Sequence, residues 1–160
     1  MRDTTKKKAR KVTPRRKQAP PCTAAARDAA RFKAFAEISS DWWWETDVDH
    51  RFSFLSDNIS RWVDPAALIG IKVFSAIVSE APGAAPLRET MERGEPFQER
   101  LLEFRSTDGD QVWIVASGKP QRDAKARLTG YLGTSRDVTE VIAAQDALRK
   151  SDALHRSLAD

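Results

Sequence analysis

The sequence predicts an α+β domain, in which two β-strands are followed by several short helices and three further β-strands, and a helix flanks each end. Two aromatic-rich segments, residues 42–46 and 51–56, surround the polar turn residues 47–50 and predict a β-hairpin. A second hairpin is predicted where the Asp-Gly pair of TDGD separates residues 97–106 from residues 111–120. The last predicted strand, LTGYLGTSR, precedes a long helical pattern.

The chain has 160 residues and a net charge of +4, but the charge is unevenly distributed. Residues 1–18 contain nine Lys or Arg and one Asp, whereas the other 142 residues contain 18 Lys or Arg and 22 Asp or Glu. The first segment therefore carries +8 and the rest −4. We expect residues 1–27 to be a disordered basic tail, because their composition cannot bury enough apolar surface.

A basic tail can contact nucleic acid or an anionic membrane. Here the composition favours a solvated tail over a nucleic-acid contact, because no aromatic residue is interleaved with the charges to stack on bases. No apolar run approaches the roughly 20 residues that span a bilayer, and the N-terminus lacks the apolar core of a signal peptide. We expect a cytoplasmic protein without a membrane span.

Residues 28–40 predict a helix with an apolar stripe that includes Phe32 and Phe35, and Asp28 is a candidate N-cap. Three consecutive tryptophans follow, in a predicted strand. Strand alternation puts Trp42 and Trp44 on one face and Trp43 on the other. In the next strand, Phe52 and Phe54 are predicted to share one face.

Residues 57–95 predict several short helical pieces, with Pro65 at a first helical position and Gly70 and Gly94 at helix ends. In the last strand, Gly130 and Gly133 predict a bend or a close backbone approach. The C-terminal helix has the pattern of a capping box at Asp137 and Glu140. It continues as a weak heptad seam, formed by Val141, Ala144, Leu148, Ser151, His155 and Leu158.

The order of these elements resembles that of PAS domains, the sensory modules common in bacterial histidine kinases and cyclic-dinucleotide enzymes. The likeness spans roughly residues 32–140 and rests on the stretches DWWWETDVDHRFSFLS, FRSTDGDQVWIVASGKPQRD and LTGYLGTSRDVTE. It implies a five-stranded antiparallel sheet with the spatial order 2-1-5-4-3 and short helices that enclose a pocket on one face. The chain then divides into a tail at 1–27, a PAS sensor domain at 28–137, and an exit helix or coiled-coil linker at 138–160.

The pocket is predicted to be apolar, with the candidate lining residues Trp44, Leu55, Ile59, Trp62, Leu68, Ile69, Phe74, Ile77 and Leu102. Two interpretations remain open: these side chains fill a core, or they surround a small apolar or aromatic ligand such as a flavin. Cysteinyl-flavin chemistry is disfavoured, since Cys22 is the only cysteine and lies in the tail. Haem is disfavoured too, since His50 lies in a turn and His155 in the exit helix.

We expect no metal site and no catalysis in this chain, because no ligand cluster, phosphate loop or nucleophile–base motif is present. Asp137, Thr139 and Glu140 resemble the family's exit motif, which implies that they relay a signal to the C-terminal helix. A homodimer is predicted through aromatic residues of the outer sheet face and both flanking helices, namely Phe32, Phe35, Trp43, Phe54, Trp113, Val141 and Leu148.

The resulting hypothesis is a sensory and dimerisation module at the front of a multidomain signalling protein, with a kinase or cyclase domain downstream. Two alternatives stay open: a nucleic-acid-binding protein that uses the basic tail, and a dimerisation module without a ligand.

Overall fold

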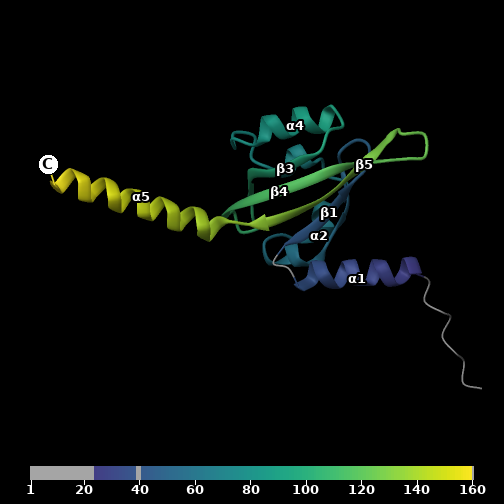
Figure 1. Cartoon of the computed structure of the whole chain (residues 1–160), viewed down its shortest axis with the longest axis horizontal. Coiled ribbons are helices and arrows are strands. Elements are labelled where there is room, and N and C mark those ends of the chain that lie inside the picture. Colours follow the sequence, from purple (N-terminus) through teal and green to yellow (C-terminus); the bar gives the residue numbers. More distant parts are fainter. Residues whose placement is uncertain (1–23, 39–40, 160) are drawn as a thin grey trace, which may run out of the picture.

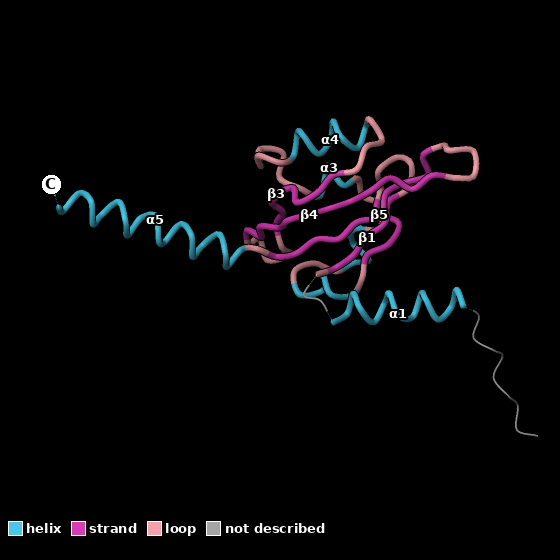
Figure 2. Tube along the Cα trace, in the orientation of Figure 1, coloured by secondary structure: helices cyan, strands magenta, loops and turns pink. Residues whose placement is uncertain are grey.

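The fold is centred on one antiparallel sheet of five strands in the order β2-β1-β5-β4-β3 (Figures 1 and 2). The computed structural model describes residues 24–38 and 41–159. The strands are β1 (Trp42–Thr46), β2 (Phe52–Leu55), β3 (Phe97–Arg105), β4 (Gln111–Arg122) and β5 (Leu128–Asp137). The predicted fold class and strand order are confirmed. Both hairpins form where the turn residues predicted them, with Gly109 at a φ of 86° in the second.

Four short helices connect β2 to β3 and cover one face of the sheet, which we call the inner face. They are η1 (Asp57–Arg61), α2 (Pro65–Leu68), α3 (Val73–Ala76) and α4 (Ala84–Glu92). The carboxylate of Asp64 accepts a hydrogen bond from the backbone N–H of Ala66 (3.0 Å) and so caps α2. Positive φ angles at Gly70 and Gly94, 80° and 67°, follow α2 and α4 as the sequence predicts.

The helices at the two ends of the chain lie outside the sheet-and-helix body. Helix α1 spans Ala24–Ile38, so the prediction of an N-cap at Asp28 is wrong: the alanine-rich run before Asp28 extends the helix by four residues. The rest of the predicted tail lies outside the described residues. Helix α5 (Thr139–Ala159) projects from the body on the side away from the N-terminal end of α1 (Figure 1), and it has no buried residue.

The prediction that Phe52 and Phe54 share a face is wrong, because β2 contains a β-bulge. Phe54 pairs with Glu45 while Phe52 pairs with Thr46, which leaves Ser53 as an extra residue between them. Thr46 is buried on the inner face, so its partner Phe52 turns inward. Phe54 remains on the outer face, where it stacks on Trp43.

The hydrophobic core lies between the inner sheet face and the short helices. Its buried members come from every layer: Trp42, Trp44, Leu55, Ile59, Val73, Leu87, Met91, Phe97, Leu102, Phe104, Val112, Ile114, Ala116 and Tyr131. The alternation predicted for the three tryptophans holds, since Trp42 and Trp44 are buried here and Trp43 is only half-buried on the other face. Within the described residues, no helix is long and apolar enough to cross a membrane.

Candidate functional site: an apolar cavity and the junction with the C-terminal helix

A cavity of about 80 Å³ lies inside the core, between the inner sheet face and the short helices. Its walls are almost entirely apolar and come from all five strands and the helices between β2 and β3. The lining residues are Trp42, Trp44, Phe52, Leu55, Ile59, Val63, Leu68, Val73, Ala76, Ile77, Leu87, Phe97, Leu102, Phe104, Arg105, Ile114, Ala116 and Ser135. Ligand sites are typically about 300–1,000 Å³, so this cavity is small by that measure.

The indole of Trp44 occupies a flat slot beside this cavity. A Cβ atom on Gly133 would overlap the indole ring, and one on Gly118 would lie 3.0 Å from it and 2.7 Å from the Phe97 ring. The rings of Trp44 and Phe97 are nearly parallel, with 14° between their planes and 6.2 Å between their centroids. The indole N–H donates a buried hydrogen bond to the hydroxyl of Ser135 (3.0 Å). Two glycines, one ring and one hydroxyl therefore fix the position of Trp44.

Six of the nine residues predicted for the pocket line the cavity: Trp44, Leu55, Ile59, Leu68, Ile77 and Leu102. Trp62 lies behind the cavity wall, with its ring centroid 5.0 Å from that of Trp42. Phe74 faces a separate surface hollow beside α4, where the guanidinium of Arg88 lies 4.9 Å from its ring centroid. Ile69 is 47% exposed. Helix α2 ends at Leu68, and Ile69 is its C-cap residue, so the Ile69 side chain turns outward.

Sequence reasoning missed the strand residues that form the cavity floor. Ile114 and Ala116 alternate with half-buried residues along β4, and this two-residue period was a usable signal. Leu87 of α4 and Phe97 at the start of β3 carried no such signal, since only the folded arrangement brings them to the cavity.

His50 lies in the hairpin turn, as the sequence predicts, but its ring is partly buried. Its ring makes edge-to-face contacts with Phe74 (5.5 Å between centroids) and Tyr131 (5.9 Å), and its Nδ1 atom is buried without a hydrogen-bond partner in the described structure. Burial lowers the pKa of His50 below its ordinary value, against the opposing effect of Glu92. The weaker charge effects come from Lys72, Asp47 and Asp49.

Neither histidine lines the cavity: His50 lies at the hairpin turn and His155 is exposed on α5. Cys22 lies outside the described residues. Among residues 24–38 and 41–159, no group of three or more His, Cys, Asp or Glu is arranged to hold a metal ion.

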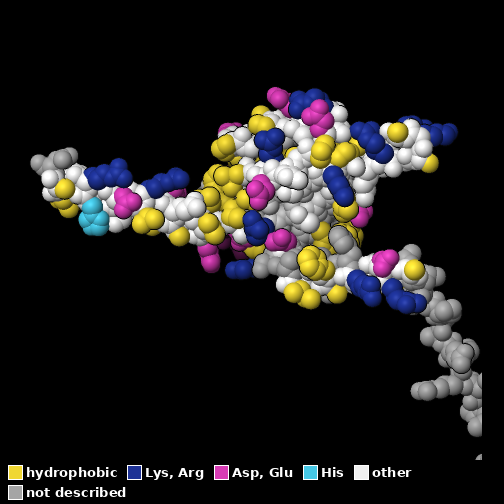
Figure 3. Space-filling view, in the orientation of Figure 1, with side chains coloured by type: hydrophobic (Ala, Val, Ile, Leu, Met, Phe, Trp, Pro, Cys, Tyr) yellow, Lys and Arg dark blue, Asp and Glu magenta, His cyan; other side chains and the backbone are white. Residues whose placement is uncertain are grey.

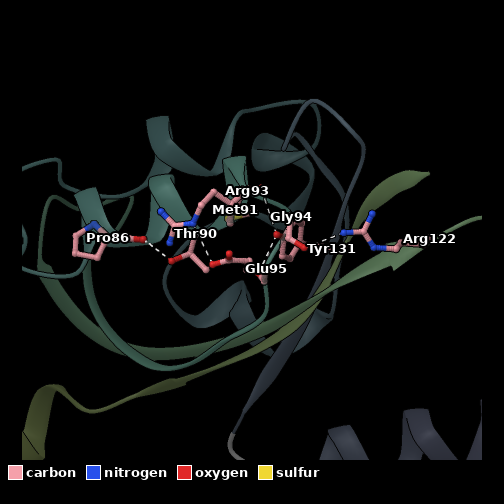
Figure 4. Close-up of polar contacts among 8 residues, drawn as sticks. All are labelled: Pro86, Thr90, Met91, Arg93, Gly94, Glu95, Arg122 and Tyr131. Carbon is pink, nitrogen blue, oxygen red and sulfur yellow. Dashed lines mark hydrogen bonds and ion pairs between the residues drawn. The ribbon is translucent and has the colours of Figure 1, made fainter. Parts of the chain in front are cut away.

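Tyr131 joins the sheet to the end of α4 (Figure 4). Its side chain is fully buried, and its hydroxyl donates to the carbonyl of Glu95 (2.9 Å) and lies 3.3 Å from that of Met91. Burial raises the pKa of this hydroxyl, so it remains a donor at neutral pH. A guanidinium nitrogen of Arg122 donates to the carbonyl of Gly94 (3.0 Å) in the same region.

The outer sheet face carries the aromatic residues that were predicted for an interface. Trp43 and Phe54 stack with 4.2 Å between their ring centroids, beside Lys33 of α1, and Phe54 is 37% exposed. Trp113 is half-buried on β4. Phe35 on α1 is 74% exposed, so it does not cover Trp43, and Val141 and Leu148 are exposed on α5. The side chain of Phe32 is not described.

Helix α5 is attached to the sheet at Trp113. The backbone N–H of Trp113 donates to the hydroxyl of Thr139 (2.9 Å), and the Trp113 carbonyl accepts from the backbone N–H of Val138 (2.8 Å). The carboxylate of Asp137 accepts from the backbone N–H of Thr139 (2.8 Å), which satisfies a free amide of the first turn. Glu140 is exposed and makes no reciprocal capping contact in the described structure, so the predicted capping box is incomplete.

The following three solved structures are similar to this chain. An RNA-binding light-oxygen-voltage receptor matches with a TM-score of 0.66 and 21% identity, over 89% of this chain and 41% of that receptor. A sensory box histidine kinase/response regulator from Burkholderia thailandensis matches with a TM-score of 0.61 and 21% identity, over 79% of this chain and 98% of that one. The third is a light-oxygen-voltage domain studied with a flavin analogue. It matches with a TM-score of 0.58 and 19% identity, over 80% of this chain and 98% of that domain.

The TM-scores show that the chain shares a fold with these structures, and identities this low show the fold alone. The chain spans less than half the length of the first receptor. No curated protein sequence matches the chain significantly. The family profile of the PAS domain matches residues 40–140, which is more than half of the chain. The chain therefore belongs to the PAS domain family.

Proposed function

We propose that this chain is a sensory and dimerisation module that passes a structural change from its sheet to α5. The observation that carries the proposal is the attachment of α5 to Trp113 through Thr139 and Val138. Both polar groups of the Trp113 backbone bind the start of α5, and no residue of α5 is buried elsewhere. A shift of β4 at Trp113 would therefore move the helix, while little else restrains it.

Thr139→Val tests this attachment, because valine keeps the shape of threonine and removes the acceptor of the Trp113 amide. We expect faster hydrogen exchange at Trp113 and in the first turn of α5, with a loss of about 1 kcal/mol in unfolding free energy. Thr134→Val is the matched control, since Thr134 is exposed on β5. Equal exchange in wild type and Thr139→Val would remove the basis for a relay through this contact.

A homodimer through the outer sheet face and both flanking helices is the second part of the proposal. The proposed surface comprises the outer-face residues Trp43, Phe54 and Trp113 together with the exposed residues Phe35, Val141 and Leu148. The sequence predicts Phe32 as a further member. Ile38 (85% exposed), Leu154 and Leu158 extend it along the same two helices. Large exposed apolar patches usually mark interfaces, and yellow side chains on both helices are visible in Figure 3.

Sedimentation at several concentrations tests the dimer. We expect a dissociation constant on the order of 1 μM, equivalent to about −8 kcal/mol, and a monomeric but folded Trp43→Glu variant. Ile69→Glu is the control, because Ile69 is an exposed apolar residue on the helical side of the domain. A monomeric wild type, or a dimer weakened equally by Ile69→Glu, contradicts the proposed interface.

A kinase or cyclase domain downstream of α5, in a cytoplasmic bacterial signalling protein, is the context we propose. The match to a sensory box histidine kinase supports it, and we infer that any catalytic step belongs to that other domain. The small cavity favours core packing over a flavin-sized ligand. An absorbance spectrum and native mass spectrometry of the purified chain test this: a bound flavin or haem would contradict it.

A further inference from the structure

His50, in the turn between β1 and β2, attaches α3 to the sheet. Its backbone carbonyl accepts a hydrogen bond from the backbone N–H of Val73 (2.9 Å), the first residue of α3. Its ring contacts both Phe74 of α3 and Tyr131 of β5, with 5.5 and 5.9 Å between the ring centroids. The backbone of His50 has a φ of 60°, and its N–H donates to the carbonyl of Asp47 (3.1 Å). The turn, α3 and β5 therefore meet at this one side chain.

Helix α3 depends on such contacts because it is short. It has four residues, of which Val73 alone is buried, and its N-cap residue Lys72 makes no side-chain hydrogen bond to it. One turn of helix is not stable in water by itself. The chain is paired with the sheet on either side of the helix, through the bridges of Lys72 with Arg51 and of Ile77 with Phe104. Between these two attachments, α3 can move once the contacts of His50 are lost.

Helix α3 also forms one wall of the apolar cavity. Val73 and Ala76 line the cavity, as does Ile77 directly after the helix, and Val73 is only 5% exposed. Phe74 lies instead at the surface hollow beside α4, where Arg88 covers its ring. Movement of α3 away from the sheet would take Val73 and Ala76 out of the wall and admit water to the cavity.

The packed position of the ring suits neutral His50 and does not suit its protonated form. The Nδ1 atom is buried and has no hydrogen-bond partner in the part of the chain that the structure describes. In a neutral imidazole this atom can be the unprotonated acceptor, whereas both ring nitrogens of an imidazolium are donors. A buried N–H without an acceptor, on a charged ring, carries a large desolvation cost. Burial accordingly lowers the pKa of His50.

Charged residues flank the ring and its two aromatic partners on every element that packs against them, namely Asp47, Asp49, Lys72, Arg88, Glu92, Glu95 and Arg122. Burial outweighs the attraction of Glu92, which is the largest of the charge effects on the pKa of His50, so the packed ring stays neutral. Glu92 and Asp49 are exposed. They can therefore stabilise an imidazolium that has moved out into solvent.

We propose that a proton taken up by Nδ1 of His50 releases α3 from the sheet and opens the cavity to water. The packed state holds the neutral ring, and the open state holds the imidazolium beside exposed acids. Because the open state binds the proton more tightly, its population rises as the pH falls below about 6.5, by at most about tenfold for each pH unit. This response to acid requires neither the dimer nor the relay proposed above.

Amide hydrogen exchange of the full chain, followed residue by residue by NMR at pH 7.5, 6.5 and 5.5, tests the proposal. The protection factor, which is corrected for the intrinsic pH dependence of exchange, should fall about five- to tenfold at the Val73 amide between pH 7.5 and 5.5. The indole N–H of Trp44, which lies at the cavity and is bound to Ser135, should lose protection in parallel. The amides that pair β4 with β5 should keep theirs. A loss at Val73 without a loss at Trp44 would mean that the cavity stays closed, and would overturn the proposal.

His50→Asn tests whether this ring is the group that titrates. Asparagine tolerates the positive φ at the position and carries no titrating proton, so protection at Val73 should no longer depend on pH. His155→Asn is the matched control, because His155 is the other histidine of the chain and is exposed on α5, and it should behave as wild type does. Constant protection at Val73 in wild type, an equal loss in β4 and β5, or a pH dependence that survives in His50→Asn would each overturn the proposal. If His50→Asn does not fold, the comparison of Val73 with β4 and β5 in wild type decides alone.

Discussion

Replacement of Trp44 by alanine tests most directly how the core is built. The indole lies on Gly118 and Gly133, parallel to Phe97, and is almost completely buried. Truncation of a buried tryptophan to alanine costs about 3–5 kcal/mol, and here it also leaves the Ser135 hydroxyl without its indole partner. We expect a loss of about 4 kcal/mol in unfolding free energy and a fall of about 15 °C in Tm.

The same substitution should create a site for a flat ring. The natural cavity has about 80 Å³, and loss of the indole should enlarge it past the roughly 150 Å³ in which benzene binds a dry protein cavity. Added indole can refill the slot and restore the hydrogen bond to Ser135. Saturation at about 100 times the Kd should recover about 2.7 kcal/mol, which thermal and urea unfolding with and without indole will measure.

Trp43→Ala is the matched control, because it removes the neighbouring indole from the half-buried outer face. It should cost about 1–2 kcal/mol and show no recovery with indole. Trp44→Phe should fall between wild type and Trp44→Ala, since it keeps a ring without the N–H. The reasoning is refuted if Trp44→Ala unfolds like wild type, or if indole stabilises both alanine variants equally.

Three further predictions follow from buried polar groups and glycines. Burial lowers the pKa of His50, so the contribution of its neutral form to the unfolding free energy is complete above about pH 6.5 and is lost as the pH falls toward the pKa in the folded state. Asparagine tolerates the positive φ of 60° at this position. His50→Asn should therefore flatten the pH dependence of the unfolding free energy between about pH 7 and 5. Tyr131→Phe should cost about 1–3 kcal/mol in urea unfolding, because the Glu95 carbonyl loses its donor; an unchanged midpoint would mean that water replaces the hydroxyl. Gly133→Ala should lower the Tm strongly because its methyl group meets the Trp44 ring, whereas Gly70→Ala, with open space around it, should show only the backbone cost of about 1 kcal/mol.

The sheet was largely predictable because its signals are local. Short-range geometry is specified by the Asp-Gly turn, by the alternation of Trp42, Trp43 and Trp44, and by Gly70 and Gly94 at the helix ends. The family resemblance then supplies the strand order. The bulge at Ser53 was not predictable in this way, because nothing within the sequence of β2 distinguishes a regular strand from a bulged one. The inner-face pairing of Phe52 with Thr46 appears only when the two strands are placed together.

The candidate site was predicted less completely, because burial depends on neighbours that are distant in sequence. His50 lies in a polar DVDH turn, which favours exposure, yet Phe74 of α3 and Tyr131 of β5 cover it. Ile69 has an apolar side chain and still faces solvent, since the short helix α2 turns it away from the core. Periodicity cannot settle such positions, because helices of four residues are too short to show a buried stripe.

The inner core and the start of α5 are connected along a single strand. Trp44 binds the hydroxyl of Ser135 on β5, and two residues further along that strand Asp137 holds the first turn of α5 through the Thr139 amide. The Thr139 hydroxyl in turn accepts a hydrogen bond from the backbone N–H of Trp113 on the neighbouring strand β4. The next residue of β4, Ile114, pairs with Asp137 of β5. A displacement of the Trp44 ring would therefore reach the helix within two strand positions. For the homodimer proposed above, we expect a change in contacts at the outer sheet face and α5 to reach Trp44 through the same residues in the reverse direction.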